Sequence, residues 1–133
     1  MIAGNYMVFG SLYHNRAKHA LCSIGYIMDV KEFVSIWKKE RDELYSIYTG
    51  NEDETAVSKI ISSLNLDDKT RSEINKAIDY ILTDSFYLFL TGLAGCANVG
   101  GVQQDYKLYD EDGNLVFTTG DLEAEAYEQL QCK

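Results

Sequence analysis

The first side chains along the chain that could bind a metal are two histidines and a cysteine. His14 and His19 are five residues apart, a spacing that does not place both imidazoles on one face of a helix. Cys22 follows His19 by three residues, so these two side chains would share a helical face. A zinc site needs three or four protein ligands. Two ligands do not complete such a site, and we expect no metal ion here.

An acidic stretch further along has the alternate spacing of calcium ligands. Asp110, Asp112 and Asn114 stand at alternate positions, and Asp121 occupies the twelfth place counted from Asp110. A calcium loop of this type requires glycine at the sixth place and favours glutamate at the twelfth. This chain has Leu115 at the sixth place. We therefore interpret the stretch as a polar turn without a metal.

The candidate nucleophiles are Cys96 and Cys22, because a cysteine can be activated by a histidine that is close only in space. Nothing in the neighbouring sequence marks either thiol as activated, and small buried cysteines are common in proteins. The sixteen acidic residues between 51 and 133 would always allow some pair to serve as acid and base. That pattern is uninformative, and we assign no catalytic residue.

The glycine-bearing segment 92–101 could be mistaken for a phosphate-binding loop. Such loops are followed by Gly-Lys-Ser/Thr or lead from a strand into a helix, and this segment does neither. We interpret it as a structural turn in which glycine permits the backbone angles. The alternative hypothesis is a small-ligand or enzymatic pocket with this loop and Tyr106 as its walls. No cofactor is expected.

These residues must be positioned by secondary structure, and the clearest predicted helix spans residues 31–48. Asp29 is its expected N-cap, with Glu32 three residues later as in a capping box, and Gly50 is expected at its C-terminal end. A preceding helix is predicted over residues 12–24. The apolar stripes of the two helices are Phe33, Ile36, Trp37, Leu44, Ile47 and Tyr48, and Ala17, Ala20, Leu21 and Ile24.

Two further helical segments follow the acidic turn at residues 51–54. Residues 56–64 carry apolar side chains with the spacing of a short amphipathic helix. Thr70 and Glu73 have the spacing of a capping box, which predicts a helix whose apolar stripe spans residues 74–82. Residues 83–85 offer either another cap or a bend within one longer helix. Residues 86–90 are hydrophobic all round, so we expect them to form the central, buried element.

The C-terminal part is predicted to contain a β-hairpin and a last helix. Residues 104–109 and 115–118 would pair around a turn in which Gly113 and Asn114 adopt positive φ. Gly120 and Asp121 would cap a helix over residues 122–130. The predicted fold is mainly α, with four to five helices and a C-terminal β-hairpin, in a single domain over residues 1–133. Low exposure is expected for Trp37, Ile61, Ile78 and Phe89.

Composition is that of one soluble globular domain. The chain has 133 residues, of which 46% are apolar and 25% are charged, and it contains no proline. Its three cysteines are far apart and odd in number, which indicates a reducing compartment. The sequence lacks the basic start of a signal peptide and any apolar run of about 18 residues. We expect a cytoplasmic protein that does not span a membrane.

Charge is distributed unevenly along the chain. The formal net charge is −9, with +1 on residues 1–50 and −10 on residues 51–133. Nucleic-acid phosphates and anionic membranes bind cationic side chains, so neither is an expected partner. One interpretation of the acidity is that it only keeps the protein soluble.

The other interpretation is a surface that binds a basic partner. The acids would set association rate and specificity, and two tyrosines would serve as aromatic anchors. The predicted partner-binding residues are Asp105, Tyr106, Tyr109, Asp110, Glu111, Asp112, Asp121, Glu123 and Glu125.

Several short segments between residues 81 and 131 carry a family resemblance. They are residues 86–87 (FY), 90–93 (LTGL), 100–106 (GGVQQDY), 108–111 (LYDE), 113–114 (GN), 120–123 (GDLE) and 126–127 (AY). Here the chain resembles the small immunity proteins of bacterial contact-dependent inhibition and other polymorphic toxin systems. The resemblance implies a cytoplasmic, non-enzymatic protein that binds a toxin's C-terminal domain and blocks its active site. The implied partner is a basic toxin domain, such as a nuclease.

Overall fold

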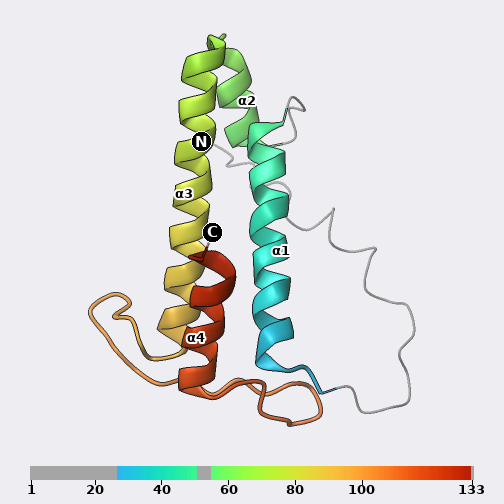
Figure 1. Ribbon diagram of the computed structural model, residues 1–133, viewed down its shortest axis with the longest axis vertical. Coiled ribbons are helices and arrows are strands. Elements are labelled where there is room, and N and C mark those ends of the chain that lie inside the picture. The colour runs from blue at the N-terminus through green and yellow to red at the C-terminus, as the bar shows by residue number, and fades with distance from the viewer. Residues whose placement is uncertain (1–26, 51–54, 133) are drawn as a thin grey trace, which may run out of the picture.

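Four packed helices make up the regular structure of the described chain (Figure 1). The computed structural model describes residues 27–50 and 55–132. The helices are α1 (Val30–Thr49), α2 (Ala56–Ser63), α3 (Asp68–Leu93) and α4 (Thr119–Leu130). The predicted helix over residues 12–24 and the acidic turn at 51–54 lie outside the described residues. The prediction of a mainly α single domain is confirmed.

Helix α1 begins where the sequence predicted. The carboxylate of Asp29 accepts a hydrogen bond from the backbone N–H of Glu32 at 2.8 Å, which satisfies one of the free donors of the first turn. Gly50 ends the helix with a φ of −68°, so the left-handed conformation typical of a C-terminal glycine is not adopted. Helix α2 is capped reciprocally by Thr55 and Ser58.

Helix α3 begins earlier than the pattern predicted, and of the two alternatives for residues 83–85 the single longer helix is found. Asp67 is its N-cap and accepts from the backbone N–H of Thr70 at 2.9 Å, so the predicted capping box at Thr70 and Glu73 is not used. Residues 83–85 neither cap nor interrupt the helix. Thr83 points inward to accept a hydrogen bond from Arg41, and the Ser85 hydroxyl bonds the carbonyl of Ile81 at 2.6 Å. One helix of 26 residues results.

The core lies where α1, α3 and α4 meet. Its buried members are Val34, Leu90, Ala94, Val116, Phe117, Leu122, Ala126 and Leu130. Leu90 is fully buried, but Leu88 and Phe89 are 50% and 46% exposed. The prediction that residues 86–90 are buried all round is therefore wrong for these two, because the described helices cover only part of this segment. Ile61 is buried as predicted, whereas Trp37 and Ile78 are half-buried.

The predicted C-terminal β-hairpin is wrong, since the described part of the chain contains no β-strand. Tyr109 and Leu115 form an isolated bridge, and the N–H of Val116 donates to the carbonyl of Leu108 at 2.9 Å. Pairing does not continue beyond this short ladder. A two-stranded hairpin needs an apolar face packed on something to be stable. Residues 104–109 are all exposed and have no such support.

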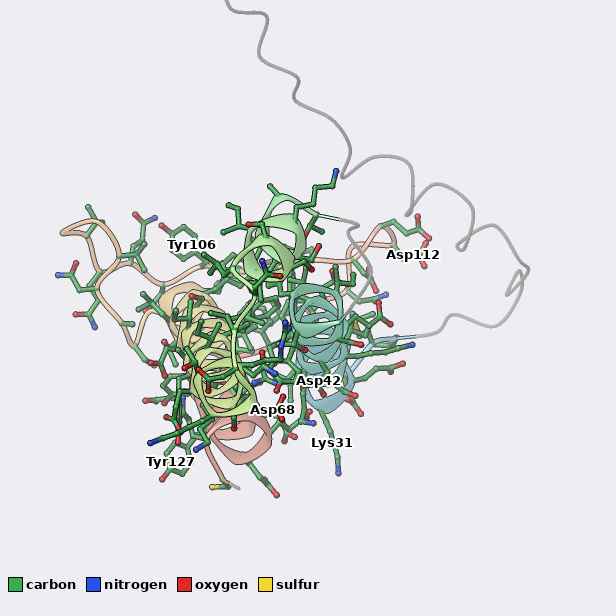
Figure 2. The ribbon with its side chains drawn as sticks, turned by 90° about the horizontal axis from the view of Figure 1, so that it is seen from above. Lys31, Asp42, Asp68, Tyr106, Asp112 and Tyr127 are labelled. Atoms are coloured by element: carbon green, nitrogen blue, oxygen red, sulfur yellow. The ribbon has the colours of Figure 1, made fainter. Side chains whose placement is uncertain are left out.

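Helices α1 and α3 form an antiparallel pair, with α4 on one side of the pair and α2 on the other. Figure 1 shows α1 and α3 side by side and running in opposite directions, and α4 packs against both. Helix α2 packs against α1. Figure 2 shows α2 and the labelled residues Tyr106 and Asp112 on the side of the pair opposite α4. Within the described ranges, no helix is long and apolar enough to span a bilayer.

Candidate functional site

The most exposed part of the described structure is the chain between α3 and α4. This α3–α4 connection (residues 94–118) has no helix or strand, and every residue from 98 to 109 is exposed. It presents six large hydrophobic side chains to solvent: Val99, Val102, Tyr106, Leu108, Tyr109 and Leu115. Loops longer than about 12–15 residues without secondary structure are uncommon in compact domains and are usually either functional or linker segments.

The connection is anchored to the end of α3. Gln103 donates to the carbonyl of Gly95 at 2.8 Å, and Asp105 crosses so close to Gly95 that a side chain there would collide with it. Gly95 also has a φ of +72°, which favours glycine. A Cβ on Gly92 would lie 2.6 Å from a methyl carbon of Val99. The start of the connection is therefore folded tightly back on the helix.

The far end of the connection is anchored in the core. Val116 and Phe117 are buried, and the Phe117 ring lies 5.5 Å from that of Phe33 on α1, measured between centroids. Thr118 then becomes the N-cap residue of α4. Both ends are fixed, so the exposed residues between them are presented from a defined position.

The acidic turn is organised by one of its own side chains. The Asp110 carboxylate accepts hydrogen bonds from the backbone N–H groups of Asp112 at 3.0 Å and Asn114 at 2.8 Å, and from the Asn114 amide at 2.9 Å. These bonds, led by that from the Asn114 side chain, lower the pKa of Asp110. Gly113 has a φ of +83° as predicted, but Asn114 does not adopt a positive φ. Asp110 therefore builds the turn, whereas Glu111 and Asp112 are exposed.

The nine residues predicted to bind a partner do not form one surface. Figure 2 places Tyr106 beyond α3 and Asp112 beyond α1, both on the side opposite α4. On α4, Asp121, Glu123 and Glu125 follow one another at intervals of two residues. Side chains two apart on a helix point about 200° apart, so Glu123 faces away from the other two.

The three acids of α4 accordingly have different neighbours. Asp121 accepts a hydrogen bond from the Thr118 hydroxyl. Glu125 accepts one from the Gln129 amide at 2.6 Å, and that amide also donates to the Lys31 carbonyl on α1. Glu123 instead meets Cys96, beside the start of the connection. The other six of the nine residues lie along the α3–α4 connection, with Tyr106 near α3 and Asp112 near α1.

Cys96 lies in an acidic environment. Its thiol donates to the Glu123 carboxylate, with 3.2 Å between sulfur and oxygen. Partial burial and this hydrogen bond raise the pKa of Cys96, and the charge of Asp105 acts in the same direction. The pKa of the nearby Tyr87 is also raised, mainly by burial and then by Glu123. The Cys96 thiol is thus protonated at neutral pH, the reverse of an activated nucleophile. His14, His19 and Cys22 lie outside the described residues.

Replacing Glu123 with glutamine is expected to make Cys96 more reactive. Loss of the carboxylate charge lowers the thiol pKa, and each unit gives tenfold more thiolate below that pKa, so alkylation at about pH 7.5 should accelerate by about threefold to tenfold. The rate would be measured with iodoacetamide across pH in a Cys22→Ser, Cys132→Ser background. Glu125→Gln, on the other side of α4, is the matched control. An unchanged pH profile for Glu123→Gln would contradict the conclusion that Glu123 raises the pKa of Cys96.

Two of the cavities in the described structure lie away from the connection. One, of about 380 Å³, runs along α1 beside Lys38 and Asp42. Another, of about 210 Å³, lies between Arg41, Thr83 and the end of α4. Among the described residues, no three His, Cys, Asp or Glu side chains converge as a metal site requires. The predicted pocket walled by residues 92–101 and Tyr106 does not coincide with either cavity.

A buried charge on α1 was not anticipated from the sequence. Arg41 is buried and forms ion pairs with Asp42 and Asp79, and it donates to the Thr83 hydroxyl at 2.9 Å. It lies in a run of charged residues that indicates a solvated helix face. One feature of the sequence could have indicated its burial: Arg41 follows the buried Val34 by seven residues and so lies on the same face of the helix. The ion pair between Arg41 and Asp79 joins α1 to α3 and therefore has a structural role.

Comparisons with protein-family models, with curated protein sequences and with solved structures find no significant match to this chain.

Proposed function

We propose that this protein is a non-enzymatic, immunity-type protein that binds and neutralises a bacterial toxin domain in the cytoplasm. The observation that carries the proposal is the exposed run at residues 98–109, which is anchored at both ends and rich in apolar side chains. The family resemblance of residues 81–131 gives the partner class. The proposed contact residues are Asp105, Tyr106, Tyr109, Glu111 and Asp112, all of which are exposed along the connection.

The chemistry of this surface suits a basic partner. Tyrosine side chains bury a large area at low entropic cost and are frequent interface anchors. Tyr106 and Tyr109 are both about half-exposed and are flanked by acids. Exposed acids accelerate encounter with a basic domain, an effect that salt screens over about 8 Å at physiological ionic strength. Asp110 is removed from the contact set because its carboxylate is occupied within the turn.

The first arm of the test replaces one tyrosine. Tyr109→Ala should weaken binding by more than about tenfold if the ring is an anchor. Tyr127→Ala on α4 is the matched control, since the two rings are 54% and 55% exposed. Affinity would be measured by biolayer interferometry against the C-terminal domain of the toxin encoded directly upstream of this gene.

The second arm reverses charge on the acidic turn. Glu111→Lys with Asp112→Lys should slow association by about tenfold and flatten its dependence on salt. Asp84→Lys with Glu128→Lys gives the same change in net charge at exposed sites on α3 and α4. Cells producing the toxin domain should lose protection only with the first pair. Equal protection and equal salt dependence for both pairs would assign the acidity to solubility alone, and no binding of the intact protein to that domain would refute the proposed function.

A further inference from the structure

On the side of the α1–α3 pair opposite α4, the described residues leave several apolar side chains of both helices exposed. On α3, Tyr87 packs against the core cluster that includes Leu122 and Ala126 of α4. Phe89 is two residues further on, so it points about 200° away from Tyr87 and hence away from α4. Its side chain is 46% exposed.

Helix α1 likewise has an exposed apolar side chain two residues away from a residue on the α4 side. Lys38 lines a cavity together with Gln129 and Leu130 of α4, which places it on the α4 side. Ile36, two residues earlier, points about 200° away and is 49% exposed. Trp37 lies between the two helices, with its ring 5.0 Å from that of Phe89 between centroids.

Two more exposed apolar side chains of α3 extend this surface, since Leu88 adjoins Phe89 and Ile81 lies two turns before it. We define the back face as Ile36, Trp37, Ile81, Leu88 and Phe89. Exposed apolar side chains gathered in this way mark an interaction site in a folded protein.

The first 26 residues of the chain have the composition to cover it. They directly precede Ile27, and fifteen of them are apolar. Their only charged side chains are Arg16 and Lys18, which give +2, whereas residues 27–133 carry a net charge of −11. The segment is therefore complementary to the rest of the chain in both hydrophobicity and charge.

The place where residues 1–26 join the described chain also lies close to the back face. Met28 and Val30 pack against the core, at the end of α1 where Phe33 is followed by Trp37, the residue of the back face that contacts it. The helix predicted over residues 12–24 would be about 20 Å long, against about 30 Å for α1. A segment that turns back at Gly25 can therefore run beside α1 over most of its length.

We propose that residues 1–26 bind the back face of their own chain, with the stripe Ala17, Ala20, Leu21 and Ile24 against Trp37 and Phe89. This inference does not depend on the proposed toxin binding, which uses the α3–α4 connection. The chain contains one tryptophan, so the fluorescence of Trp37 reports directly on whether the face is covered.

The test compares two variants of the full chain with equal changes in charge. Leu21→Asp with Ile24→Asp places charges on the apolar stripe, and Asn15→Asp with His19→Asp places charges on the opposite side of the predicted helix. The first pair should raise acrylamide quenching of Trp37 by about twofold and shift its emission to the red, because the indole loses its cover. The second pair should leave both unchanged. Equal quenching in the two variants and the parent would overturn the proposal.

A cross-linking measurement identifies what lies on the face. Leu88 is replaced by the photoreactive residue p-benzoylphenylalanine in the full chain, and the products are analysed by mass spectrometry after irradiation. A cross-link from position 88 to residues 1–26 in a product of monomer mass supports the proposal. A product of dimer mass would show that a second copy covers the face, and the absence of any cross-link to residues 1–26 would show that they do not bind there.

Discussion

Replacing Leu90 with alanine is expected to lower the free energy of unfolding by about 3–4 kcal/mol. Leu90 on α3 is fully buried in the core that α3 forms with α1 and α4, together with Val34, Leu122 and Ala126. Truncation removes buried apolar atoms and leaves a cavity that three packed helices cannot readily close. Chemical denaturation followed by circular dichroism would measure the loss.

The matched control is the same substitution at an exposed position. Leu115→Ala, in the α3–α4 connection, should cost less than about 1 kcal/mol because its side chain is 42% exposed. Comparable losses at the two positions would contradict the placement of the core. Ile78, which the sequence pattern placed in the core, is only half-buried in the described structure, so its truncation should cost less than that of Leu90.

Replacing Arg41 with methionine is expected to destabilise the fold by about 3 kcal/mol. The substitution keeps an unbranched apolar stem but removes the guanidinium that pairs with Asp79 and donates to the Thr83 hydroxyl. Removing one partner of a buried ion pair is strongly destabilising. Thermal and chemical unfolding would report the change, and Lys39→Met, at an exposed pair on the same helix, should stay within about 0.5 kcal/mol.

A second substitution separates the lost pair from lost packing. Arg41→Met combined with Asp79→Leu removes both charges, and this double variant should regain most of the stability. If the double variant were as unstable as Arg41→Met alone, the cost would come from the loss of the guanidinium's other bonds, to Asp42, Thr83 and the carbonyl of Asp79.

The helices could be predicted because their signals are local. The apolar spacing of α1 and the position of Asp29 before it depend only on neighbouring residues. The exposure of Phe89 could not be predicted, since a segment that is hydrophobic on all sides does not say which side its neighbours cover. Arg41 was missed for the related reason that its partner is 38 residues away in the sequence.

The candidate site shows the same division. The exposure of Glu111 and Asp112 follows from turn composition, which is a local property. The prediction joined them to Asp121, Glu123 and Glu125 because all are acidic and close in sequence. Helix geometry separates these three, since alternate positions that share one face of a strand lie on opposite sides of a helix. The predicted hairpin failed because a turn and alternating residues do not supply a supporting layer.

The construction of the α3–α4 connection would allow the proposed recognition of a partner to change without loss of the fold. Its anchors are few: Gly95, Gln103, Asp110 and the buried pair Val116 and Phe117. The side chains between these anchors are exposed, and substitution of such residues typically changes stability by no more than about 0.5 kcal/mol. Mutations can therefore accumulate at positions such as Tyr106 and Glu111 while the helices stay intact. A scaffold built in this way can diverge toward new partners one surface residue at a time.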